Sequence, residues 1–211
     1  MNPKRTNVIL CLSTLLILYT TLPLCAQIPR EFKMINASIN TKGDLVITAS
    51  KTSSATDFDF LAGKWTMDNK RLKTRLNNCT EWIEYKSDDE NFGPVLNGIA
   101  NIDIYRTAYN QVNNKPYEGL TLRLFNPQTK LWSLYWVDSN VGVLDPPVVG
   151  SFEGSIGTFY CKDIFQGQPI IVMFTWDKTD PNNPVWSQAF STDNGKTWEM
   201  NLTNTSHRIT P

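Results

Sequence analysis

Short apolar runs separated by turn residues are the feature that most constrains this chain. From Phe58 onward, runs of about six to ten residues, rich in aromatic and β-branched types, alternate with turn chemistry, and this texture is typical of β-strands. No apolar pattern at helical period extends beyond about two turns, which argues against a parallel βαβ architecture. We expect about ten strands, near residues 61–69, 79–86, 98–106, 119–125, 131–138, 148–153, 158–165, 169–177, 185–191 and 197–205.

The connections between these runs predict how the strands are joined. The turn at 126–129 has Pro127 at its second position, which favours type I geometry. The prolines of 145–147 and 180–184 cannot continue a hydrogen-bonded ladder. Strands joined mostly by short connections predict an all-β antiparallel meander, and closure into a barrel removes its two edges. A two-sheet β-sandwich is the alternative fold.

Several motifs resemble a known barrel class. Gly63-Lys64-Trp65 lies at the start of the first strong strand, and Arg208 lies at the end of the last one. This resembles the calycin arrangement, in which a Gly-x-Trp tryptophan closes one end of the barrel. A basic residue of the final strand then packs across the indole, a cation–π contact of about 0.5–2 kcal/mol.

Longer runs extend the resemblance to residues 58–208. They are FDFLAGKW at 58–65, LRLFNPQTKLWSLYWVD at 122–138, GVLDPPVVGSFEG at 142–154 and WSQAFSTDNGKTWE at 186–199. Together they resemble a family of exported bacterial proteins of unknown function with a calycin-like (lipocalin-like) barrel. The resemblance implies a calycin-like barrel and structural roles for Trp65 and Arg208, and it supplies no catalytic residue.

The first 26 residues have the pattern of a secretory signal peptide. Lys4 and Arg5 precede a nearly unbroken apolar stretch at 8–24, and Cys25-Ala26 follow it. This predicts cleavage after Ala26, a periplasmic or secreted protein, and no membrane span in the mature chain. Lipid attachment at Cys25 and an uncleaved anchor are the alternatives. Residues 27–57 then form a polar lead-in or linker, and 58–211 form the barrel domain.

Charge and cysteine content narrow the classes of partner. Lys plus Arg equals Asp plus Glu at 20 each, which argues against a nucleic-acid or anionic-membrane partner. The mature chain keeps Cys79 and Cys161. An exported protein with two cysteines invites a disulfide, but their expected strands lie far apart in the meander, which favours free thiols. Neither cysteine nor histidine spacing resembles a zinc site, so we predict no metal and no cofactor.

Two features near the C-terminus suggest chemistry but have structural interpretations. Residues 191–198 match Ser-x-Asp-x-Gly-x-Thr-Trp, the Asp box that recurs in sialidase propellers, but one copy does not make a propeller. We interpret it as a tight hairpin in which Asp193 accepts turn N–H bonds, Gly195 takes a positive φ and Trp198 packs beneath. His207 is the only histidine, and strand parity places it outward rather than as a haem or triad ligand.

Polar residues on otherwise apolar strand faces are the candidate site, because burying them costs free energy unless something pairs with them. If these faces line the lumen, they converge in an aromatic-walled pocket suited to a small molecule. Internal salt bridges that fix the strand register are the alternative. The candidate ligand-binding residues are Glu84, Arg106, Arg123, Trp136, Asp138, Asp163 and Gln188.

Three function classes remain open from sequence. The leading hypothesis is a non-enzymatic exported barrel that binds a small, partly apolar ligand in its lumen. The second is a small-substrate hydrolase or isomerase with a carboxylate acid–base pair, whose signature is a strongly raised carboxyl pKa inside the pocket. The third is a structural or interaction barrel with a filled core, which predicts that no interior volume remains.

Overall fold

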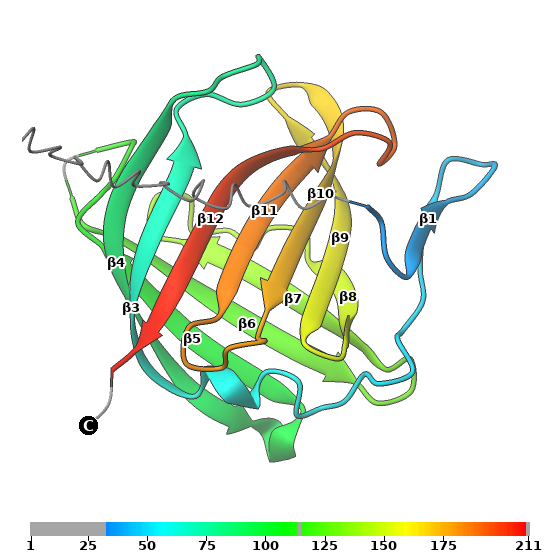
Figure 1. Cartoon of the computed structure of the whole chain (residues 1–211), viewed down its shortest axis with the longest axis horizontal. Coiled ribbons are helices and arrows are strands. Elements are labelled where there is room, and N and C mark those ends of the chain that lie inside the picture. Colours follow the sequence, from blue (N-terminus) through cyan, green and yellow to red (C-terminus); the bar gives the residue numbers. More distant parts are fainter. Residues whose placement is uncertain (1–32, 114, 210–211) are drawn as a thin grey trace, which may run out of the picture. The chain divides into compact units, whose positions relative to one another are not determined.

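The computed structural model describes residues 33–113 and 115–209, which all belong to one compact unit. The predicted signal peptide at 1–26 lies outside the described residues. Ten antiparallel strands form a closed barrel (Figure 1). They are β3 (Gly63–Leu72), β4 (Trp82–Val95), β5 (Ala100–Thr107), β6 (Tyr117–Asn126), β7 (Leu131–Asp138), β8 (Val148–Glu153), β9 (Ile156–Phe165), β10 (Gln168–Asp177), β11 (Val185–Ser191) and β12 (Glu199–Arg208).

The barrel is a simple meander. Each strand pairs with the next one in sequence, and β12 returns to pair with β3, from Leu202↔Arg71 to Arg208↔Trp65. The all-β closed barrel is therefore confirmed, and the sandwich alternative is wrong. The predicted runs at 131–138, 148–153 and 185–191 coincide with β7, β8 and β11.

Strand β4 departs most from prediction. It continues to Val95, well beyond the predicted end at Lys86, and it begins after Cys79, which lies in the preceding loop. The acidic run at 88–90 looks like a turn in sequence, yet Asp89 is buried inside the barrel. A register irregularity between Asn91 and Pro94 then bends the strand before it ends. Cys79 and Cys161 are both free thiols.

The polar lead-in contains a small hairpin of β1 (Ala37–Ile39) and β2 (Leu45–Ile47). It lies outside the barrel, near β9 in Figure 1. Apolar side chains of the hairpin pack against a buried outer cluster that includes Tyr160 and Met173. The Tyr160 hydroxyl also accepts a hydrogen bond from the Ile35 N–H at 2.8 Å.

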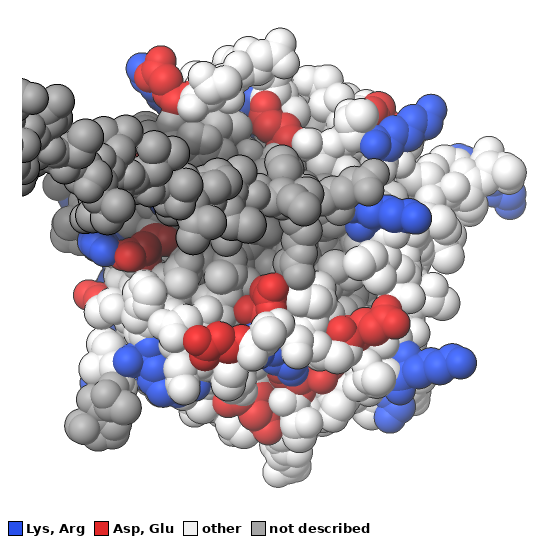
Figure 2. Space-filling model, viewed as in Figure 1, with Lys and Arg blue, Asp and Glu red and all other residues white. Residues whose placement is uncertain are grey.

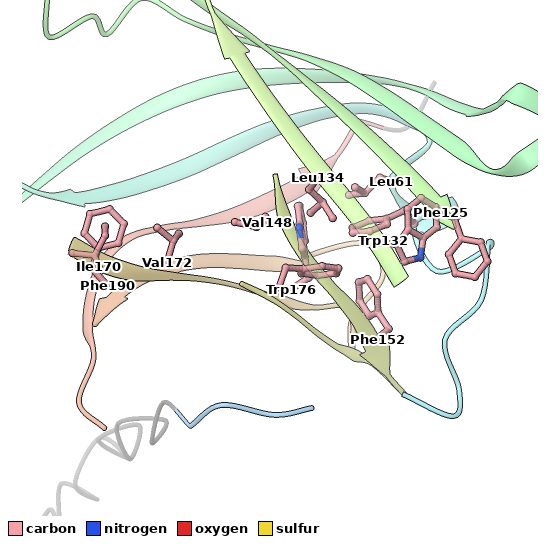
Figure 3. Close-up of a cluster of buried hydrophobic side chains, with 12 residues drawn as sticks. Leu61, Phe125, Trp132, Leu134, Val148, Phe152, Ile170, Val172, Trp176 and Phe190 are labelled. Carbon is pink, nitrogen blue, oxygen red and sulfur yellow. The ribbon is translucent and has the colours of Figure 1, made fainter. Parts of the chain in front are cut away.

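One end of the barrel is filled by aromatic side chains. The 3₁₀ turn η1 (Asp59–Leu61) follows Phe58, whose ring is fully buried and meets Trp132 edge-on at 5.0 Å between ring centroids. These rings belong to a larger buried cluster whose strand members come from β6 to β11. In Figure 3, Ile170, Val172 and Phe190 extend this cluster along the barrel, away from Trp132 and Phe152. The labelled members are Leu61, Phe125, Trp132, Leu134, Val148, Phe152, Ile170, Val172, Trp176 and Phe190.

Trp65 and Arg208 close this end. The Trp65 indole N–H donates to the Leu61 carbonyl at 2.6 Å. The Arg208 guanidinium lies 4.1 Å from the centre of the Trp65 ring. It also donates to the Ala62 carbonyl at 2.8 Å and to the Phe60 carbonyl. This is the arrangement that the Gly-x-Trp resemblance implies, and it ties the last strand to the segment before the first.

The Asp-box segment forms the turn between β11 and β12. The Asp193 carboxylate accepts hydrogen bonds from the backbone N–H groups of Lys196 and Thr197, at 3.0 and 2.9 Å, and these bonds lower the pKa of Asp193. Gly195 has a φ of +84°. The Trp198 ring packs against the outer cluster that also contacts the β1–β2 hairpin.

The outer surface carries both signs of charge. In Figure 2 lysine and arginine are interspersed with aspartate and glutamate over the visible part of one face. Exposed pairs such as Lys70–Glu84 (2.7 Å) and Arg106–Glu118 (3.0 Å) link neighbouring strands. Pairs of this kind add little stability. No helix among residues 33–113 and 115–209 has the length and apolar character to cross a membrane.

Candidate ligand-binding cavity

A cavity of about 480 Å³ lies inside the barrel. Leu61, Leu134 and Trp176 of the aromatic core belong to its lining, so the filled end forms its floor. The exposed loop residues Val112 and Val141 also line it, so the cavity reaches the surface at the opposite end. Most of its other lining comes from inward-facing residues of β3 to β7.

Aromatic rings form much of the wall. Tyr85 and Tyr109 stack with ring centroids 4.5 Å apart. Tyr105, Tyr117 and Trp136 form a second group, with Tyr105 6.1 Å from Trp136 and 6.3 Å from Tyr117. Such walls present flat apolar faces to a ligand, while the phenol groups offer hydrogen bonds.

Gly119 makes room for the Trp136 ring. A Cβ atom at position 119 would lie 2.0 Å from Cη2 of Trp136, far inside contact distance. The ring therefore lies against the β6 backbone. This position keeps the indole in the wall and leaves the lumen open beside it.

A buried polar network lies deeper in the lumen. Arg123 and Asp103 form an ion pair and are only 4% and 3% exposed. Arg123 also donates to the Asn101 Oδ1 at 2.9 Å, and its guanidinium lies 5.1 Å from the centre of the Phe58 ring. An ion pair this deep needs such additional partners, because each charge has lost its water.

Asp89 lines the cavity next to this network. Its side chain makes no hydrogen bond with any described residue. Burial, and then the charge of Asp103, raise the pKa of Asp89 to about 8, and the charge of Arg123 offsets part of this rise. Burial therefore favours the protonated form of the Asp89 carboxyl, and this form can donate a hydrogen bond into the cavity.

Two arginines line the cavity from the end of β3 and the loop after it. The Arg71 side chain donates to the Tyr109 hydroxyl at 3.3 Å and to the Leu72 carbonyl at 3.2 Å. Arg75 lies over the rings of Phe165 and Phe190, at 5.8 and 5.5 Å. Burial, and then the charge of Arg71, lower the pKa of Arg75.

The structure brings together four of the seven predicted ligand-binding residues. Arg123, Trp136, Asp138 and Gln188 all line the cavity. Asp138 accepts the Tyr117 hydroxyl at 3.0 Å, and Gln188 donates to Asn201 at 2.7 Å.

The other three predicted residues do not line the cavity. Glu84 and Arg106 are exposed on the outer face, where they pair with Lys70 and Glu118. Asp163 has the inward parity of β9 but lies near the strand end, and its side chain is exposed. These three side chains therefore lie outside the cavity.

The misplacement of Arg106 has a physical cause. On β5, Asp103 and Tyr105 point into the lumen, whereas Ile102 and Ile104 face outward. The assumption that apolar residues point inward fails because this half of the lumen is the more polar side of the sheet. The sequence analysis missed the part of the cavity wall that β4 supplies. The spacing of Tyr85 and Asp89, which places both on one face of that strand, was the signal that could have located it.

His207 lies on the outer face, where Nε2 is 3.4 Å from the Asp68 carboxylate and Nδ1 is 2.9 Å from Asn183 Oδ1. This is the facing that strand parity predicted. Within the described part of the chain, no three or more histidine, cysteine, aspartate or glutamate side chains gather in a way that could hold a metal ion.

The fold and cavity define a closed antiparallel barrel with an internal chamber of small-molecule size. Among solved structures, the chain is similar to Rv2717c from M. tuberculosis, at 12% identity and a TM-score of 0.48, over 77% of this chain and 99% of that one. It is also similar to the S-type phycobiliprotein lyase CPES from Guillardia theta, at 11% identity and a TM-score of 0.49, over 76% and 95%. No protein-family model and no curated protein matches the chain.

Proposed function

We propose that this protein binds a small, partly apolar molecule in the lumen of its barrel. The observation that carries the proposal is the cavity of about 480 Å³, which reaches the surface at one end and meets the aromatic core at the other. Small-molecule sites are typically concave, mostly apolar and supplied with a few convergent polar groups. The wall around Tyr105 and Trp136, with Asp89 and Arg123 below it, has this composition. A filled structural barrel would leave no such space.

A neutral fluorescent probe tests the proposal. N-phenyl-1-naphthylamine is apolar and brightens when it leaves water. Thr121 lines the cavity, so the indole of Thr121→Trp occupies part of it and obstructs the space beside Trp136. We expect the wild type to bind the probe and Thr121→Trp to bind it at least about tenfold more weakly, the loss of roughly 1.4 kcal/mol of contact.

Thr66→Trp is the matched control, because Thr66 is exposed on the outer face of β3. This variant adds the same bulk away from the lumen and should bind the probe like the wild type. Equal binding by all three proteins, or no binding by any, would contradict a luminal site.

A second candidate function follows from Asp89. A buried carboxyl with a pKa of about 8 beside the paired Asp103 is the signature of an acid–base site. In that case Asp89 donates a proton to a substrate in the lumen. A panel of chromogenic esters and glycosides tests this candidate, which predicts turnover that Asp89→Asn abolishes. Turnover that is absent, or equal in the variant, leaves ligand binding as the only proposal.

Export is a separate proposal. It depends on the secretory pattern of residues 1–26. The mass of the protein purified from its own cells tests it, because removal of these residues after Ala26 shortens the chain by a known amount.

A further inference from the structure

The two arginines at the outer part of the cavity, Arg71 and Arg75, form no ion pair with a described residue. Arg71 is 9% exposed, so its charge has lost most of its hydration. By contrast Arg123, at the floor of the same cavity, is neutralised by Asp103.

Arg75 is the less satisfied of the two. Its Nε atom is buried without a hydrogen-bond partner, and its side chain makes no hydrogen bond with any described residue. The charge of Glu199 offsets part of the effect of burial on the pKa of Arg75. The Glu199 carboxylate is not within ion-pair distance of Arg75, and it accepts hydrogen bonds from the Leu76 backbone N–H at 2.8 and 2.9 Å. N–H groups of a partly buried cation that lack a hydrogen-bond acceptor cost free energy, and a ligand with acceptor oxygens would remove this cost.

Arg71 lies at the end of β3, and Arg75 lies in the loop that follows this strand. Each lines the cavity, and the charge of Arg71 acts directly on Arg75. Two guanidinium groups that face one space repel each other, and a shared anion converts this repulsion into attraction. Guanidinium groups also match the planar geometry of carboxylate and phosphate oxygens.

The cavity wall beside these arginines indicates what kind of group the rest of the ligand carries. The stacked pair of Tyr85 and Tyr109 lies next to Arg71, whose guanidinium is 5.9 Å from the Tyr109 ring. The acidic side chains of the mouth, Asp138 and Asp145, come from β7 and the loop after it, on the opposite side of the strand order from β3. At the mouth of the cavity, the two arginines therefore lie on one side of the barrel, and the two aspartates lie on the other side.

We propose that the ligand of this cavity is a flat, largely aromatic molecule with one anionic group, which Arg71 and Arg75 bind together. The inference rests on the proposed luminal function and adds the charge of the ligand and the two residues that recognise it. The anionic group is a carboxylate or a phosphate, both of which two guanidinium groups can hold. The aromatic body then lies along the tyrosine wall.

A pair of probes that differ only in charge tests the inference. 8-Anilinonaphthalene-1-sulfonate is N-phenyl-1-naphthylamine with an added sulfonate. We expect the wild type to bind the sulfonate probe at least about tenfold more tightly than the neutral probe, as a charge-assisted contact provides. Arg71→Gln and Arg75→Gln should each remove most of this preference, which is measured in each variant as the ratio of its affinities for the two probes. Arg75→Lys, which keeps the charge, should retain part of it.

Arg106→Gln is the matched control, because Arg106 is exposed on the outer face. It should keep the preference for the sulfonate probe. Retained binding of the neutral probe also shows that each variant is folded. If the wild type binds both probes equally, or if the Arg71 and Arg75 variants keep the preference, the inference is overturned while luminal binding stands. If neither probe binds, luminal binding fails and the inference fails with it.

Competition identifies the kind of anion. Displacement of the sulfonate probe by 1-naphthoate supports a carboxylate ligand, and displacement by 1-naphthyl phosphate supports a phosphate ligand. If 1-naphthoate and 1-naphthyl phosphate both fail to displace the sulfonate probe, at concentrations at which they displace the neutral probe, the inference is contradicted.

Discussion

At the scale of residues, the lumen is organised by how each charge is neutralised. Arg123 is paired with Asp103 inside the barrel. Burial and the charge of Asp103 raise the pKa of Asp89 to about 8, which favours its neutral form. Arg71 and Arg75 form no ion pair with a described residue, and only the more distant charge of Glu199 acts on Arg75. These differences separate groups that hold the barrel together from groups that are available to a ligand.

Asp89 makes a testable contribution to the pH dependence of stability. Its pKa is raised from 3.8 to about 8, so between these values the folded protein keeps a proton that the unfolded chain has lost. The free energy of unfolding therefore falls as pH rises through this window. Asp89→Asn lacks this titration, so we expect it to gain stability relative to the wild type from about pH 4 to pH 8.

Urea unfolding of both proteins across this pH range measures the difference. Asp57 and Asp145, whose pKa values are also raised by burial, are present in both proteins and cancel. Parallel pH profiles for the two proteins would show that the Asp89 carboxyl is not protonated in the folded state.

At the scale of elements, the strands were predictable where turn residues mark their starts. β7, β8 and β11 agree with the sequence because each is a short run that follows a connection containing proline, at 126–129, 145–147 and 180–184. The predicted range of β4 ended too early because its inward-facing residues include Asp89 and Asn91. These residue types are common in turns, and only the closed barrel shows that they face the lumen. The facing of a strand depends on what the other strands place in the lumen, and that is a property of the closed barrel.

The candidate site was predictable only in part for the same reason. Trp136 and Asp138 follow a run of inward apolar residues, so their facing could be derived locally. Arg75 lies in a loop, where no periodicity indicates direction. Tyr109 also follows the end of its strand, and only the closed barrel brings it next to Tyr85. Contacts between segments far apart in sequence cannot be derived from local alternation.

The end of β12 is the element that seals the closed end. Arg208 donates to the carbonyls of Ala62 and Phe60 and stacks on Trp65. We expect Arg208→Ala to lower the free energy of unfolding by about 2–4 kcal/mol, since it removes a cation–π contact and charged hydrogen bonds. Urea unfolding measures the loss.

Arg106→Ala is the control for the loss of an arginine, because Arg106 is exposed and pairs only on the surface. It should cost about 1 kcal/mol or less. An equally small effect of Arg208→Ala would show that the closed end is held by apolar packing alone.

At the scale of the whole molecule, the barrel divides its interior into a filled part and a cavity. The aromatic cluster around Phe58 and Trp132 supplies the buried apolar surface that stabilises the fold. Meander pairing from β3 to β12 leaves no free barrel edge. The stability of the barrel therefore does not require the other part of the lumen to be filled, and a cavity with exposed loops at its mouth is retained.

The central claim is that this cavity holds a small molecule. Native mass spectrometry of the protein purified gently from the cells that make it, with the denatured mass beside it, tests the claim most directly. Thr121→Trp, prepared in the same way, is the comparison. We expect a small-molecule adduct on the wild type that is lost on denaturation and is absent from Thr121→Trp. A bare mass for both proteins in repeated preparations, or the same adduct on both, would contradict it.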